Sequence, residues 1–403
     1  MNESLPKKLK RMRVVGVSTS YPVRHDSVAG IFVHRLYREL ALVCDVKAVC
    51  PGDSNGGYDT GIQGVQVHAV DYAPKRFRIL GGAGGILPAL SESPLKLLLL
   101  PGLLAGLFIA VMKHAKSADI IHANWAVCGA LAGLAGKLAG RPVVTTLRGD
   151  DVTRSKKSII DRLLLNCAVR WSVKIICVSE PMAEQLGSRY PGRKPDIYTC
   201  LNGVDESFFN IEHINNPASE LRIVSIGSLI YRKGYDLLIK AVAECPQRAS
   251  LKVKIIGEGP QRDELKSLCH SLGIAGRIEF LGELNQDAVR QELSHSDVFV
   301  LASRSEGRPN ALIEAVAAGL PAISSGLDGV QGLVEHGING WIFPVEDIGQ
   351  LKDSLGSAIN NREALRGMGQ NGRQNLASGS DWAQAAKRYI GVFENALVER
   401  GKL

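Results

Sequence analysis

Short apolar runs alternate with amphipathic patterns along almost the whole chain. In the first half, these strand-like and helix-like segments cover residues 13–20, 30–41, 45–50, 119–125, 129–140, 142–149 and 173–180. The same rhythm restarts in the second half, over residues 221–229, 233–245, 251–259, 260–273, 277–284, 297–303 and 321–325. Strands that are apolar on both faces and separated by helices predict parallel α/β sheets of the doubly wound type.

A polar stretch without periodicity, residues 205–221, separates the two halves. A chain of 403 residues is also too long for one hydrophobic core. We therefore predict two Rossmann-like domains with a cleft between them, over residues 1–205 and 206–382. In open α/β sheets, ligands bind beyond the carboxyl ends of the strands, so we expect the site in the loops that follow the strands.

Two of these loops carry candidate chemistry. The strand at 221–229 ends near Gly227, which allows close backbone approach, and Arg232 and Lys233 follow it. Two cations at the start of a helix suit a diphosphate. Two ordinary solvated charges are the alternative for this stretch taken alone.

The loop from Ser303 to Arg308 follows the strand at 297–303, and Pro309 suits the first turn of a helix. Glu306 then lies in the loop and Glu314 on the helix. A helix N-terminus favours anions, and carboxylates accept hydrogen bonds from sugar hydroxyls. Together these groups suit a nucleotide sugar.

Composition and charge narrow the possible partners. With 45% hydrophobic and 22% charged residues, the chain is typical of a soluble globular protein. Residues 1–205 hold 27 Lys and Arg against 16 Asp and Glu, whereas the remainder holds 21 against 24. The basic first half favours an anionic partner such as a membrane surface, a phosphorylated lipid or nucleic acid, or else it only aids solubility.

An apolar run of 16 residues lies between Lys96 and Lys113 and contains Pro101 and Gly102. It is short for a membrane-spanning helix, which needs ~20 residues. We favour a buried helix. An interfacial helix is the alternative, supported by the flanking cations Lys75, Arg76, Arg78, Lys113 and Lys116.

Two features of the chain predict a cytoplasmic location. The eight cysteines are scattered without any CxxC spacing, which predicts reduced core residues. The basic N-terminus has no apolar segment behind it, so we expect no cleaved secretory signal.

The segment "SEGRPNALIEAVAAGLPAISS" at residues 305–325 resembles the E-x7-E signature of family 4 glycosyltransferases, which have the GT-B fold. Other blocks agree in order, and the resemblance spans nearly all of residues 12–395. These blocks are "GIFVHRLYREL", "DIIHANWAVCGALAGLAGKLAGRPVVTTLRGDDV", "VSE", "LNGVDESFF", "IGSLIYRKGYDLLIKA", "IIGEGP", "FLGEL" and "GLVEHGINGWIFP".

The resemblance implies a retaining, hexosyltransferase-type transfer from a nucleotide sugar, with UDP or GDP expected, to a glycan or lipid-linked acceptor. It implies no metal, no cofactor and no nucleic-acid partner, and a C-terminal helix at about 383–403 that crosses back onto the first domain. Glu306 would contact the donor sugar, Glu314 the ribose, and Arg232 and Lys233 the diphosphate. The implied catalytic and donor-binding residues are Glu306, Arg232, Lys233, Gly30, Gly227, Gly282, Glu283, Leu284, Gly307, Arg308, Pro309, Asn310 and Glu314.

One departure concerns the acceptor side. Where the family has histidine in T-x-H-G-x-D, this chain has Arg148, which cannot act as a base, while Asp151 is retained. We hypothesise that Arg148 reflects a different donor or acceptor. The candidates for the acceptor side are His122, Trp125, Arg148 and Asp151, with a core role as the alternative for Trp125.

Two alternatives to a glycosyltransferase remain open. One is a sugar-nucleotide epimerase or phosphorylase with the same fold. The other is a non-catalytic subunit that binds a nucleotide sugar, which the presence of Glu306, Glu314, Arg232 and Lys233 argues against.

Overall fold

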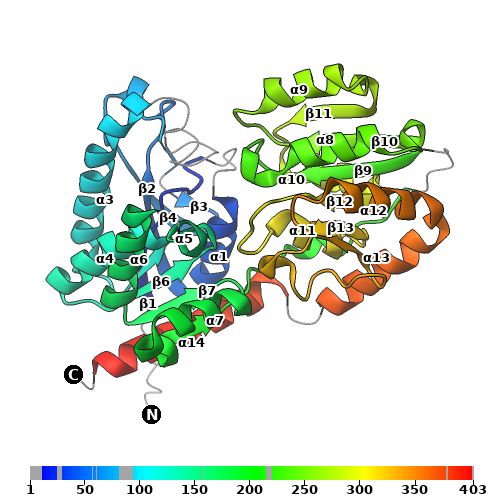
Figure 1. Ribbon diagram of the computed structural model, residues 1–403. Helices are drawn as coiled ribbons and strands as arrows, with labels where there is room; N and C mark the ends of the chain where they lie inside the picture. The colour runs from blue at the N-terminus through cyan, green and yellow to red at the C-terminus, as the bar shows by residue number, and fades with distance from the viewer. Residues whose placement is uncertain are drawn as a thin grey trace, which may run out of the picture.

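The computed structural model describes residues 11–24, 30–56, 58–59, 61–80, 94–156, 158–214, 220–377 and 380–401. They form two α/β domains, each with its own sheet (Figure 1). The predicted fold of two doubly wound, Rossmann-like domains is confirmed.

The N-terminal sheet has eight strands in the order β3-β4-β2-β1-β5-β6-β7-β8, and all its pairs are parallel except β3 with β4. Its strands are β1 (Met12–Val17), β2 (Cys44–Pro51), β3 (Gly61–Ile62), β4 (Val65–Val70), β5 (Ile120–Asn124), β6 (Val143–Leu147), β7 (Lys174–Cys177) and β8 (Ile197–Thr199). The helices of this domain are α1 (Ile31–Ala41), α3 (Leu100–Ala115), α4 (Ala126–Ala139), α5 (Asp150–Arg154), α6 (Ile159–Trp171) and α7 (Glu180–Arg189), with 3-10 turns η1 (Lys75–Phe77), η2 (Pro94–Leu99), η3 (Pro191–Asp196) and η4 (Glu206–Phe208).

The C-terminal sheet has six parallel strands in the order β11-β10-β9-β12-β13-β14. They are β9 (Leu221–Ile226), β10 (Leu251–Ile256), β11 (Ile278–Gly282), β12 (Val298–Leu301), β13 (Ala322–Ser325) and β14 (Gly340–Phe343). The helices of this domain are α8 (Tyr235–Glu244), α9 (Arg262–Ser271), α10 (Gln286–Ser294), α11 (Asn310–Ala317), α12 (Ile348–Asn360) and α13 (Arg362–Ala377), with 3-10 turns η5 (Tyr231–Lys233), η6 (Arg248–Ser250), η7 (Ala275–Arg277) and η8 (Asp328–Val330).

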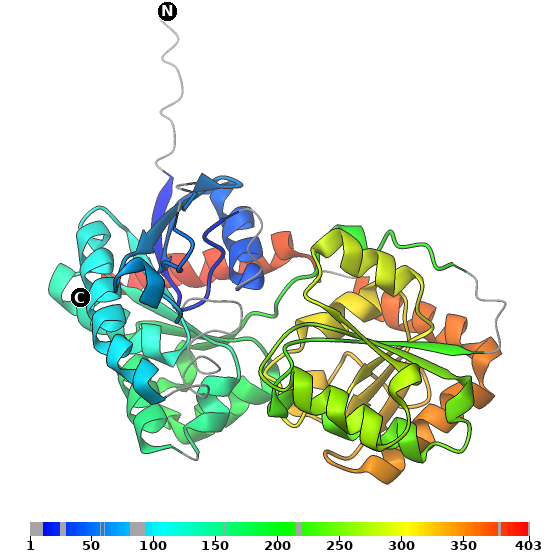
Figure 2. The same ribbon diagram turned by 90° about the horizontal axis from the view of Figure 1, so that it is seen from above.

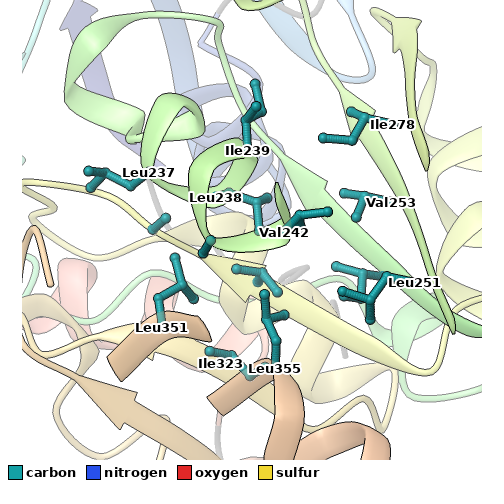
Figure 3. Close-up of a cluster of buried hydrophobic side chains, with 14 of the residues drawn as sticks. Leu237, Leu238, Ile239, Val242, Leu251, Val253, Ile278, Ile323, Leu351 and Leu355 are labelled. Atoms are coloured by element: carbon teal, nitrogen blue, oxygen red, sulfur yellow. The ribbon is translucent and has the colours of Figure 1, made fainter. Parts of the chain in front are cut away.

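Apolar side chains from both layers fill the core of the C-terminal domain. Leu238 of α8 and Leu355 of α12 meet Val253 and Ile323 of the sheet, and all four are fully buried (Figure 3). Such packing supplies most of the stability of a doubly wound sheet, because apolar strands are covered on their faces by helices.

The last helix, α14 (Trp382–Arg400), returns from the C-terminal domain to the N-terminal domain (Figure 1). It packs against α1, and its Tyr389 and Phe393 are buried in the same cluster as Leu36 and Leu40 of α1. Through this helix, the two ends of the chain share one core.

Four strands were not predicted from the sequence: β3, β4, β8 and β14. β3, β8 and β14 are only two to four residues long, which is too short for a periodic pattern. β4 reads "VQVHAV", with Val65 and Val67 alternating as in a half-buried strand, so sequence reasoning missed a signal that was present.

The apolar run after residue 94 differs from the buried helix that we favoured. It forms a continuous helical stretch, Leu95–Ala115, of 21 residues with a mean hydropathy of 2.3, long and apolar enough to cross a membrane, of which only 22% is buried. One stripe, which includes Leu103 and Leu107, packs onto the sheet in the crossover from β4 to β5, while Leu98 and Ile109 are exposed. The buried-helix prediction is therefore correct for one face of the helix only.

Candidate active site

A buried carboxylate is held by two cations in the C-terminal domain. Glu306 lies in the loop after β12 and is 6% exposed. It accepts hydrogen bonds from Lys233 Nζ at 2.6 Å and from Ser303 Oγ at 2.8 Å, and Arg232 Nη1 lies 3.5 Å away. The structure thus brings together Glu306, Arg232 and Lys233, three residues that the sequence singled out.

The neighbouring cations together outweigh burial in setting the pKa of Glu306. Burial by itself raises the pKa of the Glu306 carboxyl, but the neighbouring Lys233 and Arg232 more than offset it, and the net pKa lies below the usual value. Glu306 is therefore ionised at neutral pH. A charged pair of this kind is stable inside a protein only when hydrogen bonds satisfy its lone pairs, a condition that Ser303 helps to meet.

Local backbone geometry positions the two cations. Gly234 precedes α8 in the left-handed conformation (φ 65°), and a Cβ there would lie 2.0 Å from the carbonyl oxygen of Ala302. A larger residue would thus separate the loop after β9 from the loop after β12. The amide of Arg304 donates to the carbonyl of Arg232 at 2.8 Å and joins the same two loops.

The second predicted carboxylate contacts the other domain. Glu314 lies on α11, and its Oε1 accepts a hydrogen bond from Arg35 Nη1 of α1 at 2.5 Å. The two side chains are 14% and 8% exposed. Sequence reasoning missed Arg35, because a helical pattern gives no signal for a contact with a different domain.

The two domains also touch through backbone. A Cβ on Gly149 would lie 2.3 Å from the Cα of Gly307, and one on Gly307 would lie 2.1 Å from the carbonyl oxygen of Arg148. Gly149 also has a φ of 114° that L-residues rarely adopt. The loop after β6 therefore packs directly on the loop that carries Glu306.

Arg148 joins two segments of the N-terminal domain, one of which continues to the other domain. Its Nη2 donates to Asn124 Oδ1 at 2.6 Å, and its Nη1 donates to Asn202 Oδ1 at 3.1 Å. Asn202 Nδ2 in turn donates to Asn310 Oδ1 at 2.9 Å, directly at the start of α11. Phe32 and Trp125 flank the guanidinium at 4.9 and 6.0 Å. Arg148 therefore makes a structural link, in addition to any contact with a substrate.

His122 is a correction to the prediction for the acceptor side. It is fully buried, with ring nitrogens bonded to Tyr37 at 3.0 Å and Thr146 at 2.8 Å. Tyr389 and Phe393 of α14 cover the ring, and burial lowers the pKa of His122 to about 3. A neutral histidine beneath this layer does not line a cleft.

The remaining acceptor-side candidates lie near Arg148. Trp125 is half-buried, has a positive φ of 69° and contacts Phe32 edge-to-face at 6.1 Å. Asp151 accepts hydrogen bonds from the amides of Ala126 at 2.8 Å and Arg148 at 2.9 Å, so its carboxylate holds two loops of the N-terminal domain together.

The other residues predicted to bind the nucleotide-sugar donor lie at the carboxyl ends of their strands or at helix starts. Gly30 precedes α1 with a φ of 63° and lies against Ser20, and Gly227 ends β9. Gly282 ends β11 and accepts a hydrogen bond from the amide of Gly257 at 2.7 Å, and Glu283 and Leu284 follow it.

At the start of α11, Pro309 is the residue before the helix and has no N–H, so it cannot bind the nucleotide-sugar donor through a backbone amide. The neighbouring Arg308 is largely buried, and burial lowers its pKa to about 10. Among the described residues, no group of three or more His, Cys, Asp and Glu side chains is arranged to hold a metal ion.

Comparison with known proteins identifies the family of the chain. The chain matches the family model "Glycosyltransferase Family 4" over residues 29–208 and "Glycosyl transferases group 1" over residues 207–375. It is 26% identical to N-acetyl-alpha-D-glucosaminyl L-malate synthase of Bacillus anthracis, over 72% of this chain and 78% of that protein. It is also 29% identical to an uncharacterized glycosyltransferase of Methanocaldococcus jannaschii, over 57% of this chain and 62% of the relative.

Solved structures show the same fold. Sucrose-phosphate synthase from Thermosynechococcus elongatus superposes with a TM-score of 0.78 at 19% identity, over 96% of this chain and all of that one. Anabaena HepE in complex with UDP and glucose superposes with a TM-score of 0.75 at 19% identity, over 95% and 100% of the two chains. Two Rossmann-like domains, the E-x7-E loop and helix, and both family models agree, and the chain belongs to the family 4 glycosyltransferases of the GT-B fold.

Proposed function

We propose that this protein transfers a sugar from a nucleotide-sugar donor to a glycan or lipid-linked acceptor, with retention of the anomeric configuration. The observation that carries the proposal is the cluster of Glu306, Lys233 and Arg232 beside the start of α11. It offers cations, helix amides and a carboxylate within one small region, the groups that a nucleotide sugar needs.

The proposed chemistry depends on stabilising the charge that develops on the leaving group. Breaking the bond between the sugar and the diphosphate leaves negative charge on the leaving group, which preorganised donors stabilise. Arg232 and Lys233 would hold this diphosphate, and the amides at the start of α11 would assist. In the same proposal, Glu306 keeps the two cations in place and contacts the donor sugar.

Glu314 would accept the ribose hydroxyls. A carboxylate has two oxygens with several acceptor sites, so Glu314 can keep its bond to Arg35 and still bind a ribose. Arg35 would then orient Glu314 from the opposite domain, and ribose binding would depend on domain closure.

We also propose a UDP-sugar as the first donor to test, because the structural relative HepE was solved with UDP-glucose. The relatives include the amylovoran biosynthesis glycosyltransferase AmsK and the lipopolysaccharide core glycosyltransferase LpsE. They support a role in building a polysaccharide or glycolipid, and we propose that the protein does this in the cytoplasm. We further propose a hexosyl donor and a transfer that needs no metal, so a chelator should leave the rate unchanged.

A thermal-shift screen against UDP-, GDP-, ADP- and CMP-sugars tests the proposal, because a ligand that binds the folded state raises its apparent stability. We expect one nucleotide to raise the melting temperature, and Glu314→Ala to reduce that shift. Glu335→Ala, an exposed carboxylate elsewhere in the same domain, is the control. A stabilising donor consumed without any acceptor would instead indicate an epimerase or hydrolase, and no shift with any donor would reject nucleotide-sugar binding.

A further inference from the structure

One side of the N-terminal domain exposes an unusual number of large apolar side chains. They lie on the helical layer made of η2 with α3, α4 and α6, in which α4 packs against both α3 and α6. We define this set as the apolar face; it comprises Leu95, Leu97, Leu98, Ile109, Leu134, Leu138, Ile159, Ile160 and Leu163. Leu98 is 79% exposed and Ile159 is 72% exposed, whereas soluble proteins rarely gather such residues in one region without a partner.

The same layer is basic. Its helices α3, α4 and α6 carry Lys113, Lys137, Arg162 and Arg170, which are all exposed, against a single carboxylate, Asp161. Asp161 is itself paired with Arg154 at 3.0 Å. Exposed leucines and isoleucines among unopposed cations match the chemistry of an anionic lipid surface.

The position of the apolar face relative to the site strengthens this match. Leu95, Leu97 and Leu98 lie at the start of the Leu95–Ala115 stretch, near the carboxyl end of β4, where a Cβ on Gly102 would meet Tyr72. Ile159 and Ile160 begin α6, on the same carboxyl-end side of the sheet. Arg148 follows β6 on that side as well. This end of the apolar face therefore lies on the same side of the sheet as Arg148, whereas Leu134 and Leu138 lie toward the far end of α4.

The opposite layer of this domain has a different character. There α14 lies beside α1 (Figures 1 and 2), and the two helices bury apolar side chains in one cluster, which leaves Leu42, Val43 and Val398 as the exposed large apolar side chains at or near the ends of these two helices. The helix α3 also keeps Leu103 and Leu107 fully buried on the sheet, which fixes it to the domain and argues against a spanning role.

We propose that the apolar face docks on a membrane surface rich in anionic phospholipid, with the apolar side chains at the headgroup level and the cations on the lipid phosphates. Docking would bring the acceptor half of the site next to the bilayer. The proposal rests on the proposed function for the lipid-linked character of the acceptor, whereas vesicle binding itself does not depend on catalysis.

Co-sedimentation with vesicles tests the proposal. The full chain should bind vesicles of phosphatidylcholine mixed with phosphatidylglycerol, bind phosphatidylcholine alone at least ten-fold less, and dissociate as salt is raised. The triple variant Leu98→Ser, Ile159→Ser and Ile160→Ser should lose this binding at least ten-fold. The matched control is Leu42→Ser, because Leu42 is as exposed as Ile159, at 72%, but follows α1 on the opposite layer.

Each outcome decides between interpretations. No salt-sensitive binding to anionic vesicles, or equal binding by the triple variant, would overturn the proposal. So would a dimer of the wild-type chain that the triple variant dissociates, because the face would then belong to a second copy. The nucleotide-sugar thermal shift should stay unchanged in the triple variant, so a failure of docking is separable from a failure of the proposed function.

Discussion

The two halves of the candidate site are assembled in different ways. The hydrogen bonds to the Glu306 carboxylate come from the C-terminal domain, through loops that follow β9 and β12, neighbours in one sheet. Arg148 contacts Asn124 of β5 and Asn202 after β8 within the N-terminal domain, and Asn202 continues the network to Asn310 of the other domain.

Because of this difference, the two halves depend on the arrangement of the domains to different extents. The cluster at Glu306 is complete inside one folded domain, so binding of the donor diphosphate and sugar there depends little on the partner domain, whereas the proposed ribose contact of Glu314 depends on Arg35 of that domain. The link from Asn202 to Asn310 at the end of the Arg148 network forms only when the domains are closed, since it joins the N-terminal domain to α11. We infer that the arrangement of the C-terminal half is set within one domain, whereas the network of the N-terminal half is complete only when the two domains are closed.

The largest expected effect comes from breaking the Glu306 cluster. Glu306→Gln removes the carboxylate that pairs with Lys233 in a buried site, and removing one partner of a buried pair typically costs about 3 kcal/mol of stability. We also expect transfer to fall by roughly 1,000-fold, as for lost electrostatic groups in other active sites. Urea denaturation and single-turnover assays measure the two effects.

The matched control is Glu346→Gln. Glu346 pairs with Arg304 at 2.7 Å in the same domain, but its side chain is 56% exposed. Exposed pairs contribute about 0 to 1 kcal/mol, so this variant should behave like the wild type. Equal losses in the two variants would show that burial of Glu306 has no special consequence.

The contact between the domains gives the next largest effect. Gly149→Ala places a Cβ against the Cα of Gly307 and should hold the domains apart, while leaving each domain folded. Misplacement by about 1 Å can cost roughly 100-fold in rate, so we expect kcat/KM to fall by about that factor. Small-angle scattering should show a larger radius of gyration.

Gly276→Ala is the control for that variant, because a Cβ on Gly276 meets nothing within 4 Å. If Gly149→Ala lost activity without any change in scattering, the two halves would not be coupled through this contact.

Arg148→Lys tests the network itself. Lysine keeps the charge but cannot contact Asn124 and Asn202 at once, so at least one polar group loses its partner. We expect a loss of about 2 kcal/mol in the free energy of unfolding and a roughly 10-fold lower rate. Binding of the nucleotide to the C-terminal half should change little, and a large drop in nucleotide affinity would contradict the separation of the two halves.

The smallest effect is a pH dependence that distinguishes the halves. Burial lowers the pKa of His122 to about 3, below its ordinary value of 6.5. Between these values the unfolded chain binds the extra proton, so stability decreases as the pH falls below 6.5. One such group contributes a slope of about 1.4 kcal/mol per pH unit.

The ionisation of Glu306 affects stability in a lower pH range than that of His122. Its depressed pKa stabilises the fold above the ordinary value of 4.5, and that contribution is lost as the pH falls further. Urea denaturation between pH 6 and pH 5 should therefore show a smaller slope in His122→Asn than in the wild type. Glu306→Gln should keep the wild-type slope there. His114, whose pKa burial lowers to about 4, adds the same slope to all three proteins. Identical slopes in the wild type and His122→Asn would contradict the assignment.

Much of the C-terminal half could be predicted from the sequence. The strand at 297–303, the loop with Glu306 and the cations Arg232 and Lys233 form a pattern that a parallel sheet brings to one edge. The fold class and both glutamates' positions followed from short-range patterns. The contacts of Arg232 and Lys233 with Glu306 did not follow from such patterns, because both cations were expected to face the diphosphate alone.

The N-terminal half was harder to predict. His122 was expected to line a cleft, but α14, from the far end of the chain, buries it. Arg148 was recognised as a departure, yet its partners Asn124 and Asn202 lie 24 and 54 residues away. The apolar character of residues 97–112 was visible, but its exposure was not.

The sequence by itself determined the alternation of strands and helices, the two domains and the residue types at the strand ends, because these depend on periodicity and on local turn chemistry. The tertiary structure decided which of these residues meet. Arg35 reaches Glu314, Gly149 touches Gly307 and Asn202 joins Asn310 only because two separately folded sheets face each other. Contacts between domains have no period along the chain, so only the folded molecule reveals them.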